Sequence, residues 1–320
     1  MTLKGVFLDL DTVGFKGDVK LRALEKVLSV LRVFGVTPAE KLVENVADAE
    51  VLILNKARLP AEAIRRFPAV RLICVAATGV NNVDLAAAWE KGIGVCNVPA
   101  YSTMAMAQHV FALLLALTHH LKEYEALLQE GAWKRAPQFT LLDYPIRELA
   151  GKRFGILGYG NTGKAVARVA EAFGMSVLVA ARNKDDKRPG RLPLEELLPL
   201  VDVLSIHVPL LPETRELIGP KELTLMKPDA VLINCARGAI VDERALATML
   251  RAGRLAGAAV DVLSEEPPVH GNPLLDPGIP NLIVTPHIGW AAREARQRVV
   301  QEMALNIAAF QKGELRNRVA

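Results

Sequence analysis

The sequence predicts an α/β protein of two doubly wound parallel-sheet domains, and three observations support this fold class. The chain has 320 residues, more than one hydrophobic core usually serves, so two domains are expected. Apolar residues make up 51% of the chain and aromatic residues only 5%, which is typical of aliphatic α/β cores. Short apolar runs alternate with helix-like segments in two series, as parallel strands covered by helices require.

The first series occupies the N-terminal hundred residues. Its apolar runs predict four buried strands, at 6–10, 51–55, 72–77 and 93–98. Pro99 ends the pattern, and a long apolar-rich helix is expected from about Ser102 to Gly131.

The second series begins at Gly151. It predicts five strands in parallel order, at 153–158, 176–181, 203–208, 230–235 and 255–262. The series ends near Thr285-Pro286-His287, and a final amphipathic helix is expected from about Arg293 to Lys312.

Composition excludes several classes of partner. The 39 basic and 35 acidic residues are spread along the chain, so the net charge of +4 does not indicate a nucleic-acid partner. The apolar run 110–117 is too short to span a bilayer and the N-terminus lacks a signal segment, so we expect a cytoplasmic protein with no membrane partner. Cys74, Cys96 and Cys235 have no ligand spacing, which predicts reduced, buried thiols and no metal site.

The strongest motif is the glycine sequence Gly158-Tyr159-Gly160-Asn161-Thr162-Gly163. An apolar strand at 154–157 precedes it and a helix-like segment at 164–173 follows, which is the order that a dinucleotide-binding turn requires. Gly158 permits the tight turn, Gly160 lets a pyrophosphate approach the backbone, and Gly163 lets helix and strand pack closely. The helix N-terminus offers free N–H groups to the phosphates, so we expect a nicotinamide dinucleotide cofactor.

The end of the next strand bears on which dinucleotide is used. It reads Ala181-Arg182-Asn183, without the acidic residue that holds a ribose 2′-hydroxyl in NAD-binding proteins. Arg182 offers a planar cation to a 2′-phosphate, whereas Asp185 and Asp186 lie beyond the strand end and are interpreted as loop charges. NADP(H) is therefore favoured, with NAD(H) possible.

Three charged residues follow late strands of the second series. They are Arg237, Glu266 and His287. Hydride transfer to a 2-oxo acid needs a cation for the substrate, a proton donor for the nascent alkoxide and a partner that keeps the donor charged. Carboxyl ends of parallel strands meet at one edge, so we expect the three side chains to lie together there.

Seven stretches in order resemble the D-isomer-specific 2-hydroxyacid dehydrogenase family, and within it the glycerate dehydrogenase/hydroxypyruvate reductase branch. They are AATGVNNVD (76–84), NVPAYST (97–103), LAGKRFGILGYGNTG (149–163), HVPLLPETRELI (207–218), INCARGAIVDERAL (233–246), AAVDVLSEEPP (258–268) and NLIVTPHIGWAAREARQR (281–298). The resemblance covers essentially the whole chain. It implies an enzyme that moves a hydride between NAD(P) and a small 2-oxo or 2-hydroxy acid, as a hydroxypyruvate/glyoxylate reductase or D-glycerate dehydrogenase.

The resemblance also implies the domain plan. A flavodoxin-like substrate domain at 1–99 and 287–320 would surround an inserted Rossmann cofactor domain at 100–286. It further implies a homodimer that forms through the helix at 102–131. A separate hypothesis is that the domains close where the chain crosses between them, at Pro99 and Pro286, and so exclude water.

Site roles follow from the same resemblance. Arg237 would bind the substrate carboxylate and oxo group, and His287 would be the acid in reduction and the base in oxidation. Glu266 would hydrogen-bond His287 and favour its charged form. The substrate carboxylate would meet backbone N–H groups of the turn Thr78-Gly79-Val80. Asn55 and Lys56, after the second N-terminal strand, would add polar contacts at the pocket rim. For Lys56, a solvated side chain is the equal alternative.

The resemblance assigns a further set of residues to the dinucleotide, with Asp261 meeting the nicotinamide amide. The set is Thr103, Gly158, Gly160, Asn161, Thr162, Gly163, Ala181, Arg182, Asn183, His207, Val208, Pro209, Thr214, Cys235, Ala236, Asp261 and Gly289.

Three alternatives stay open at this stage. The enzyme could act on a bulkier 2-oxo acid, or on formate or phosphite. The chain could instead be a dinucleotide-sensing interaction module without catalysis, because fold does not imply function.

Overall fold

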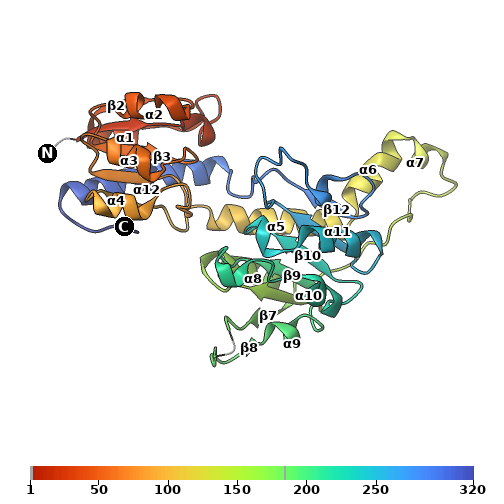
Figure 1. Cartoon of the computed structure of the whole chain (residues 1–320). Coiled ribbons are helices and arrows are strands. Elements are labelled where there is room, and N and C mark those ends of the chain that lie inside the picture. Colours follow the sequence, from red (N-terminus) through yellow and green to blue (C-terminus); the bar gives the residue numbers. More distant parts are fainter. Residues whose placement is uncertain (1–2, 184) are drawn as a thin grey trace. The chain divides into compact units, whose positions relative to one another are not determined.

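The computed structural model describes residues 3–183 and 185–320, and the chain divides into two compact units (Figure 1). Unit 1 runs to Ser102 from the N-terminus and includes Trp290–Ala320, while unit 2 is Thr103–Gly289. The predicted boundaries at 99 and 286 differ slightly from these. Residues 287–289 group with unit 2 because their backbone N–H groups bond to Asp261.

Unit 1 is built on a five-stranded parallel sheet. Its order, β2-β1-β3-β4-β5, is that of a flavodoxin-like doubly wound sheet, as predicted. The strands are β1 (Leu3–Phe7), β2 (Leu28–Val33), β3 (Val51–Leu54), β4 (Leu72–Val75) and β5 (Gly94–Cys96). The helices are η1 (Leu10–Thr12), α1 (Arg22–Val27), η2 (Ala39–Lys41), α2 (Leu42–Val46), α3 (Ala61–Arg66), α4 (Leu85–Glu90) and α12 (Arg293–Gln311).

The last helix, α12, matches the predicted C-terminal helix and packs against α1 and β4. A forked ion pair fixes it: Arg296 donates from Nη1 and Nη2 to the two carboxylate oxygens of Asp18, at 2.9 and 2.5 Å. The hydrogen bonds from Arg296 lower the pKa of Asp18 to about 2. This pair joins the two ends of the chain within unit 1.

Strand β2 was not predicted. It is an edge strand that pairs only with β1 among the described strands, and most of its side chains are exposed or half-buried. Such a segment has no buried apolar run, so its extended state depends on a partner strand that is distant in sequence.

Unit 2 is built on a seven-stranded parallel sheet of order β12-β11-β10-β9-β6-β7-β8. The chain reverses its direction of strand addition between β6 and β9, as in a Rossmann sheet. The strands are β6 (Arg153–Leu157), β7 (Ser176–Ala180), β8 (Arg191–Leu192), β9 (Val203–Ile206), β10 (Val231–Asn234), β11 (Gly257–Val260) and β12 (Leu282–Val284). The short outer strands β8 and β12 add to the five that were predicted.

Helices cover both faces of this sheet. The helices of unit 2 are α5 (Thr103–Thr118), α6 (Leu121–Gln129), α7 (Ala132–Arg135), α8 (Asn161–Ala172), α9 (Leu194–Leu197), η3 (Pro212–Thr214), α10 (Pro220–Leu225), η4 (Gly238–Ile240), α11 (Glu243–Arg251) and η5 (Pro273–Leu275). Alternate strand residues face opposite cores: Leu204 and Leu232 lie in one apolar cluster, and Val203 and Val231 in the other, with α5 and α8.

The predicted helix 102–131 is wrong as a single element. It breaks after Thr118, and α6 restarts at a bend of 55°. His120 has φ 50°, a left-handed conformation that cannot continue a right-handed helix, and its ring stacks on Tyr144 at 5.4 Å. In the described part of the chain no single helix is long and apolar enough to cross a membrane; α5 and α6 reach that length only together, across their bend.

Predicted strands overrun the observed ones by one to three residues at their carboxyl ends. These residues form loops at the carboxyl edges of the two sheets, where ligands bind in doubly wound folds.

All three cysteines are buried, as predicted, and burial raises the pKa of each thiol, that of Cys96 to about 11.

Candidate active site

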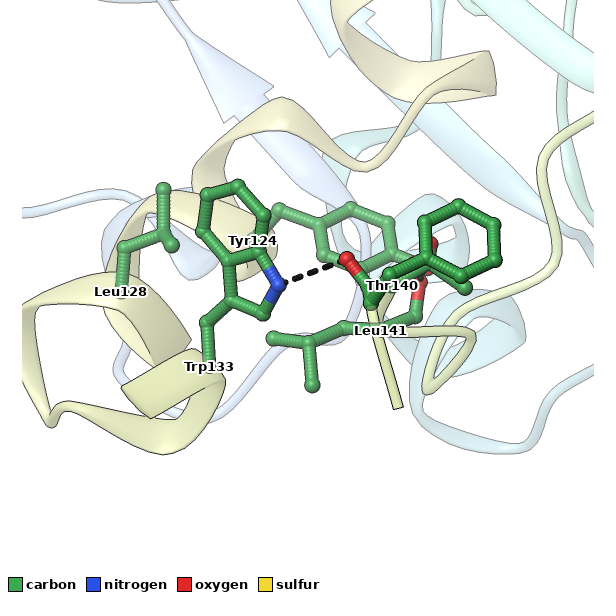
Figure 2. A pocket seen from close by; sticks show the side chains of 6 residues that line it. Tyr124, Leu128, Trp133, Thr140 and Leu141 are labelled. Carbon is green, nitrogen blue, oxygen red and sulfur yellow. Dashed lines mark hydrogen bonds between the residues drawn. The ribbon is translucent and has the colours of Figure 1, made fainter. Parts of the chain in front are cut away.

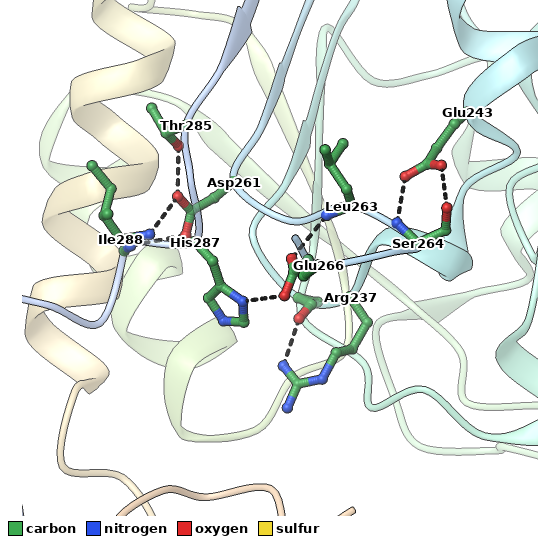
Figure 3. A network of polar contacts seen from close by, with 11 residues as sticks. Arg237, Glu243, Asp261, Leu263, Ser264, Glu266, Thr285, His287 and Ile288 are labelled. Atoms are coloured by element: carbon green, nitrogen blue, oxygen red, sulfur yellow. Dashed lines mark hydrogen bonds and ion pairs between the residues drawn. The ribbon is translucent and has the colours of Figure 1, made fainter. Parts of the chain in front are cut away.

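The three predicted catalytic residues follow three neighbouring strands of unit 2 (Figure 3). Arg237 follows β10, Glu266 follows β11 and His287 follows β12. Because β10, β11 and β12 are adjacent and parallel, their carboxyl ends bring the three side chains to one edge of the sheet.

His287 and Glu266 form a direct hydrogen bond. The imidazole Nδ1 lies 2.7 Å from Oε2 of Glu266, and Oε1 of that carboxylate accepts the backbone N–H of Leu263 at 2.9 Å. A carboxylate can only accept, so Nδ1 carries a proton and Nε2 is the nitrogen that faces away from Glu266 (Figure 3). The pair therefore fixes the protonated ring nitrogen and the orientation of the imidazole.

The backbone of His287 is held by Asp261. His287 has φ 55°, which is unusual for a residue with a side chain, and its N–H donates to the carbonyl oxygen of Asp261 at 2.8 Å. The Asp261 carboxylate accepts the N–H groups of Ile288 and Gly289 at 2.9 and 2.8 Å. Side chains of Thr285 and His109 complete its contacts, at 2.6 and 3.2 Å.

These contacts correct the role expected for Asp261. Its side chain has no exposed surface, so the carboxylate cannot touch a nicotinamide directly. Burial acts to raise the pKa of Asp261, but the hydrogen bonds from His109, Thr285 and the two backbone N–H groups outweigh it and lower the pKa. Asp261 is thus a stable buried anion that shapes the His287 loop.

Arg237 is exposed at the same edge, and Asn234 shapes its loop. The buried Asn234 amide donates to the carbonyl oxygen of Arg237 at 2.9 Å and accepts the N–H of Ala236 at 3.1 Å. A Cβ at Gly238 would lie 2.0 Å from the carbonyl carbon of Leu263, so the Arg237 loop packs directly on the loop that carries Glu266.

The glycine motif forms the predicted turn between β6 and α8. Gly158 has φ 101°, and a Cβ at Gly163 would lie 2.1 Å from the carbonyl oxygen of Gly158, so both positions require glycine for the fold. At Gly160 an added Cβ would meet nothing within 4 Å, and its φ of −82° suits any residue. The fold leaves free space in front of the α8 N-terminus, where a bound pyrophosphate would fit.

The loop after β7 presents Arg182. Asp186 folds back to accept the N–H of Arg182 at 2.7 Å, and Arg188 binds both of its carboxylate oxygens, at 2.7 and 2.6 Å. Asp186 is thus a paired structural anion, and the hydrogen bonds from Arg188 lower its pKa. Among the described residues, nothing pairs with the Arg182 guanidinium.

Arg191 on β8 points toward the glycine turn. Its guanidinium lies 4.7 Å from the ring centroid of Tyr159, the second residue of the motif. In the described part of the chain its buried Nη1 has no hydrogen-bond partner. A buried cationic donor without an acceptor is costly, so this atom is suited to bind an anionic or polar group.

The loop after β9 contains His207 and Thr214. His207 packs its backbone against Gly158, and its Nε2 lies 2.9 Å from the buried Ser205 hydroxyl. Burial lowers the pKa of His207 to about 4. The Thr214 hydroxyl accepts the N–H of Leu211 at 2.7 Å and donates to the oxygen of Pro209 at 2.7 Å, so it closes this loop.

In unit 1, Asp9 organises the loop after β3. Its buried carboxylate accepts the N–H groups of Asn55, Lys56 and Ala57, at 2.8, 2.6 and 2.7 Å. The Asn55 side chain is 3% exposed and donates to Thr12 at 3.0 Å, which corrects its predicted place at a pocket rim.

The turn after β4 has the predicted donors. Within residues 3–183 and 185–320, the backbone N–H groups of Thr78, Gly79 and Val80 have no protein acceptor. The Thr78 hydroxyl donates to Val98 at 3.1 Å, and Asn97 donates to the Thr78 oxygen at 2.7 Å, which fixes the turn. Successive free N–H groups of this kind form an anion-binding concavity.

The remaining predicted cofactor residues also lie at the carboxyl edge of the unit 2 sheet or at the start of its helices. Asn161 and Thr162 are the first residues of α8, and Thr103 is the first residue of α5. The other residues lie in the loops after four strands: Ala181 and Asn183 after β7, Val208 and Pro209 after β9, Cys235 and Ala236 after β10, and Gly289 after β12. Sequence reasoning missed Asp9, Arg191, Ser205, Asn234 and Glu243. Of these five, only Asn234 and Glu243 lie in a stretch that carries the family resemblance, INCARGAIVDERAL (233–246).

Away from this edge, an apolar pocket lies between α6, α7 and the following loop (Figure 2). Tyr124, Leu128, Trp133, Thr140 and Leu141 line it with Phe139, and Trp133 Nε1 donates to the Phe139 oxygen at 2.9 Å. Several large apolar side chains nearby are exposed, Phe139 by 89%.

Among the described residues, no group of three or more His, Cys, Asp or Glu side chains is placed to hold a metal ion.

Known proteins are similar along the whole chain. Residues 111–289 match the family model described as D-isomer specific 2-hydroxyacid dehydrogenase, NAD binding domain. A glycerate dehydrogenase of Methylorubrum extorquens is 40% identical over 99% of both chains. A hydroxypyruvate reductase of Blautia hydrogenotrophica is 37% identical over 98% of this chain and 97% of its own. A solved protein of Thermus thermophilus has a TM-score of 0.85 at 37% identity and covers 99% of this chain and 100% of its own.

Proposed function

The chain belongs to the D-isomer specific 2-hydroxyacid dehydrogenase family, and from this premise we propose that it reduces hydroxypyruvate or glyoxylate, or runs the reverse oxidation of D-glycerate. The family fixes the reaction class, which is hydride transfer between a nicotinamide dinucleotide and a 2-oxo or 2-hydroxy acid. The substrate proposal is supported by the two relatives named above, which are called glycerate dehydrogenase and hydroxypyruvate reductase.

One observation carries the mechanism: the 2.7 Å hydrogen bond between His287 Nδ1 and Glu266 Oε2. Glu266 accepts from Nδ1, so Nε2 is the nitrogen through which His287 would exchange a proton with the substrate. We assign His287 as the acid in reduction and the base in oxidation, and Glu266 as its partner.

The nicotinamide, when bound, supplies a hydride in reduction and accepts one in oxidation. In reduction His287 would donate its Nε2 proton to the oxo oxygen of the substrate, and in oxidation it would accept the proton of the hydroxyl group. After reduction His287 would regain a proton from solvent. Arg237 stabilises negative charge as it develops on the substrate oxygen, and it contacts the carboxylate.

We assign the substrate carboxylate to the turn Thr78-Gly79-Val80, whose three N–H groups lack acceptors among the described residues. Lys56 adds a cation on the neighbouring loop, which Asp9 holds in shape. These roles follow from anion binding by clustered N–H groups and from the charge of the substrate.

We assign the dinucleotide to the carboxyl edge of the unit 2 sheet. Gly160 and the first residues of α8, Asn161 to Gly163, would hold the pyrophosphate. The loop residues after β7, β9 and β10, together with Thr103 and Gly289, would line the rest of the dinucleotide site. Asp261 would act through the loop that it shapes.

For the choice of dinucleotide we propose a preference for NADP(H). Ala181 offers no carboxylate to a ribose 2′-hydroxyl, and Asp186 is occupied by Arg188 and by the Arg182 backbone. Arg182 and the buried Nη1 of Arg191 are the cations that a 2′-phosphate would neutralise. Arg191 was not among the residues predicted from the sequence.

We also propose a cytoplasmic homodimer. The exposed apolar side chains of α6, α7 and the loop around Phe139 form a patch of the kind that marks protein interfaces. The first part of the predicted dimer helix, α5, contributes buried residues to the core of unit 2, whereas α6 has none. We therefore assign the contact with a second copy to α6 and to α7, which packs on it. Light scattering that gives a monomer mass would refute the dimer.

The test is a substrate panel. Initial rates are measured with hydroxypyruvate, glyoxylate and phenylpyruvate, each with NADPH or NADH, and in the oxidising direction with formate and NADP⁺ or NAD⁺. We expect the highest kcat/KM with hydroxypyruvate or glyoxylate. Preference for phenylpyruvate or formate would overturn the substrate, and tight dinucleotide binding without turnover would favour a sensing module.

A further inference from the structure

Glu243 belongs to the quoted motif INCARGAIVDERAL and has no role so far, yet it binds the loop that carries Glu266 (Figure 3). Its Oε1 accepts the backbone N–H of Ser264 at 2.7 Å, and its Oε2 accepts the Ser264 hydroxyl at 2.6 Å and the Asn272 amide at 2.7 Å. Three donors on one carboxylate fix Ser264 in place.

The α11 helix does not need this carboxylate. Asp242 caps the helix by accepting the N–H of Ala245 at 2.9 Å, and Glu243 is the first helical residue. A negative charge is favourable near a helix N-terminus, and the oxygens of Glu243 bond to another loop.

The loop held by Glu243 is short and leads directly to the acid–base pair. Leu263 and Ser264 lie on Gly238, which follows Arg237. The Leu263 N–H then donates to Oε1 of Glu266, whose Oε2 bonds His287. A shift of Ser264 would therefore change the distance between Glu266 and His287.

We propose that Glu243 is a positioning residue: it clamps Ser264 and so sets the geometry of the Glu266–His287 pair. Its carboxylate oxygens bind Ser264 and Asn272, so Glu243 acts through this loop. The inference rests on the proposed function, in which the Glu266–His287 pair transfers the proton. The other charged groups around His287 in unit 2 are Arg237, and Asp261 with His109 behind its backbone.

The test compares Glu243→Ala with the matched control Asp242→Ala. Both remove a carboxylate at the start of α11, but only the first releases Ser264. The primary readout is the titration of the His287 ring by NMR with ¹⁵N-labelled histidine, assigned with His287→Gln, because it does not depend on turnover.

We expect Glu243→Ala to lower the midpoint of the His287 titration and to move the alkaline limb of kcat/KM for reduction to lower pH. A loss of kcat of about 10-fold is expected, since small misplacements of catalytic groups are costly. Asp242→Ala should lower Tm without either shift. In a Glu266→Gln background, Glu243→Ala should cause no further shift, because its effect passes through Glu266.

The outcomes separate the two proposals. If the parent turns over no 2-oxo acid, the proposed function fails, while a shifted His287 titration in Glu243→Ala still supports the clamp. If Glu243→Ala leaves the titration unchanged, or if its shift persists in full in the Glu266→Gln background, the positioning role is wrong. Equal shifts in Asp242→Ala would also overturn it, since the effect would then be general loosening of α11.

Discussion

The backbone N–H of His287 donates to the carbonyl oxygen of Asp261 at 2.8 Å while His287 itself has φ 55°. An unfavourable backbone angle at a residue with a side chain persists only when surrounding contacts over-determine it. Here the Asp261 carboxylate supplies those contacts by binding the next two N–H groups. The direction of the His287 ring thus depends on a residue whose side chain does not bond to it.

The same device recurs on other functional loops. Asp9 binds three backbone N–H groups of the loop with Lys56, and Glu243 binds that of Ser264. In each case an anion satisfies N–H groups that no strand or helix can pair, which fixes a loop without regular structure.

Asp261→Asn should weaken catalysis more than it weakens the fold. One side-chain oxygen becomes an amide N–H group, which cannot accept from Gly289 or Ile288, so the His287 loop loses part of its support. We expect kcat to fall at least about 100-fold, and the free energy of unfolding by about 1–3 kcal/mol. Stopped-flow turnover measures kcat, and urea denaturation measures the free energy of unfolding. Thr285→Val removes only one donor and is the milder control; parent-like kcat in Asp261→Asn would contradict the account.

The two glycines of the turn should respond differently to alanine. Gly163→Ala places a Cβ 2.1 Å from the Gly158 oxygen, so it should lower Tm. Gly160→Ala meets no protein atom within 4 Å, so Tm should stay near that of the parent while dinucleotide affinity, measured by isothermal titration calorimetry, falls at least about 10-fold. Parent-like affinity in Gly160→Ala would contradict the pyrophosphate assignment.

The 2′-phosphate proposal predicts a selective loss. Arg182→Ala or Arg191→Ala should reduce kcat/KM for NADPH by about 10- to 100-fold, as for a lost charge-assisted hydrogen bond, and leave the NADH value nearly unchanged. Lys152→Ala removes an equal charge at the amino end of β6 and should change kcat/KM for neither NADPH nor NADH. An equal loss with both dinucleotides would instead assign Arg191 to the structure of the turn.

Stability should depend on pH through His207. Burial lowers its folded pKa to about 4, against 6.5 for an unperturbed histidine. Between these values the unfolded chain binds a proton here and the folded chain does not, so stability falls as the pH falls from about 6.5 to about 4. Tm measured over this range should decline less in His207→Asn, and an equal decline in both proteins would contradict this role. Asp18, with a pKa lowered to about 2, contributes only at lower pH.

The sheet architecture could be predicted because its strands are buried apolar runs. The gathering of Arg237, Glu266 and His287 at one sheet edge could be predicted because each lies in a loop that follows such a run. The edge strand β2 and the break at His120 could not, since both depend on distant partners, β1 and Tyr144. The carboxylates Asp9 and Glu243 are polar residues in ordinary patterns. Their roles arise only when the fold brings in loops 46 and 21 positions away.

The most direct test of the central claim is the steady-state kcat for hydroxypyruvate reduction with NADPH in the parent and in His287→Gln, with dinucleotide affinity measured on both. The account predicts a parent that turns over and a variant slowed about 10²- to 10⁴-fold with unchanged dinucleotide affinity, as expected for a lost general acid. A variant with the kcat of the parent would contradict the assignment of His287, and with it the mechanism proposed for this site.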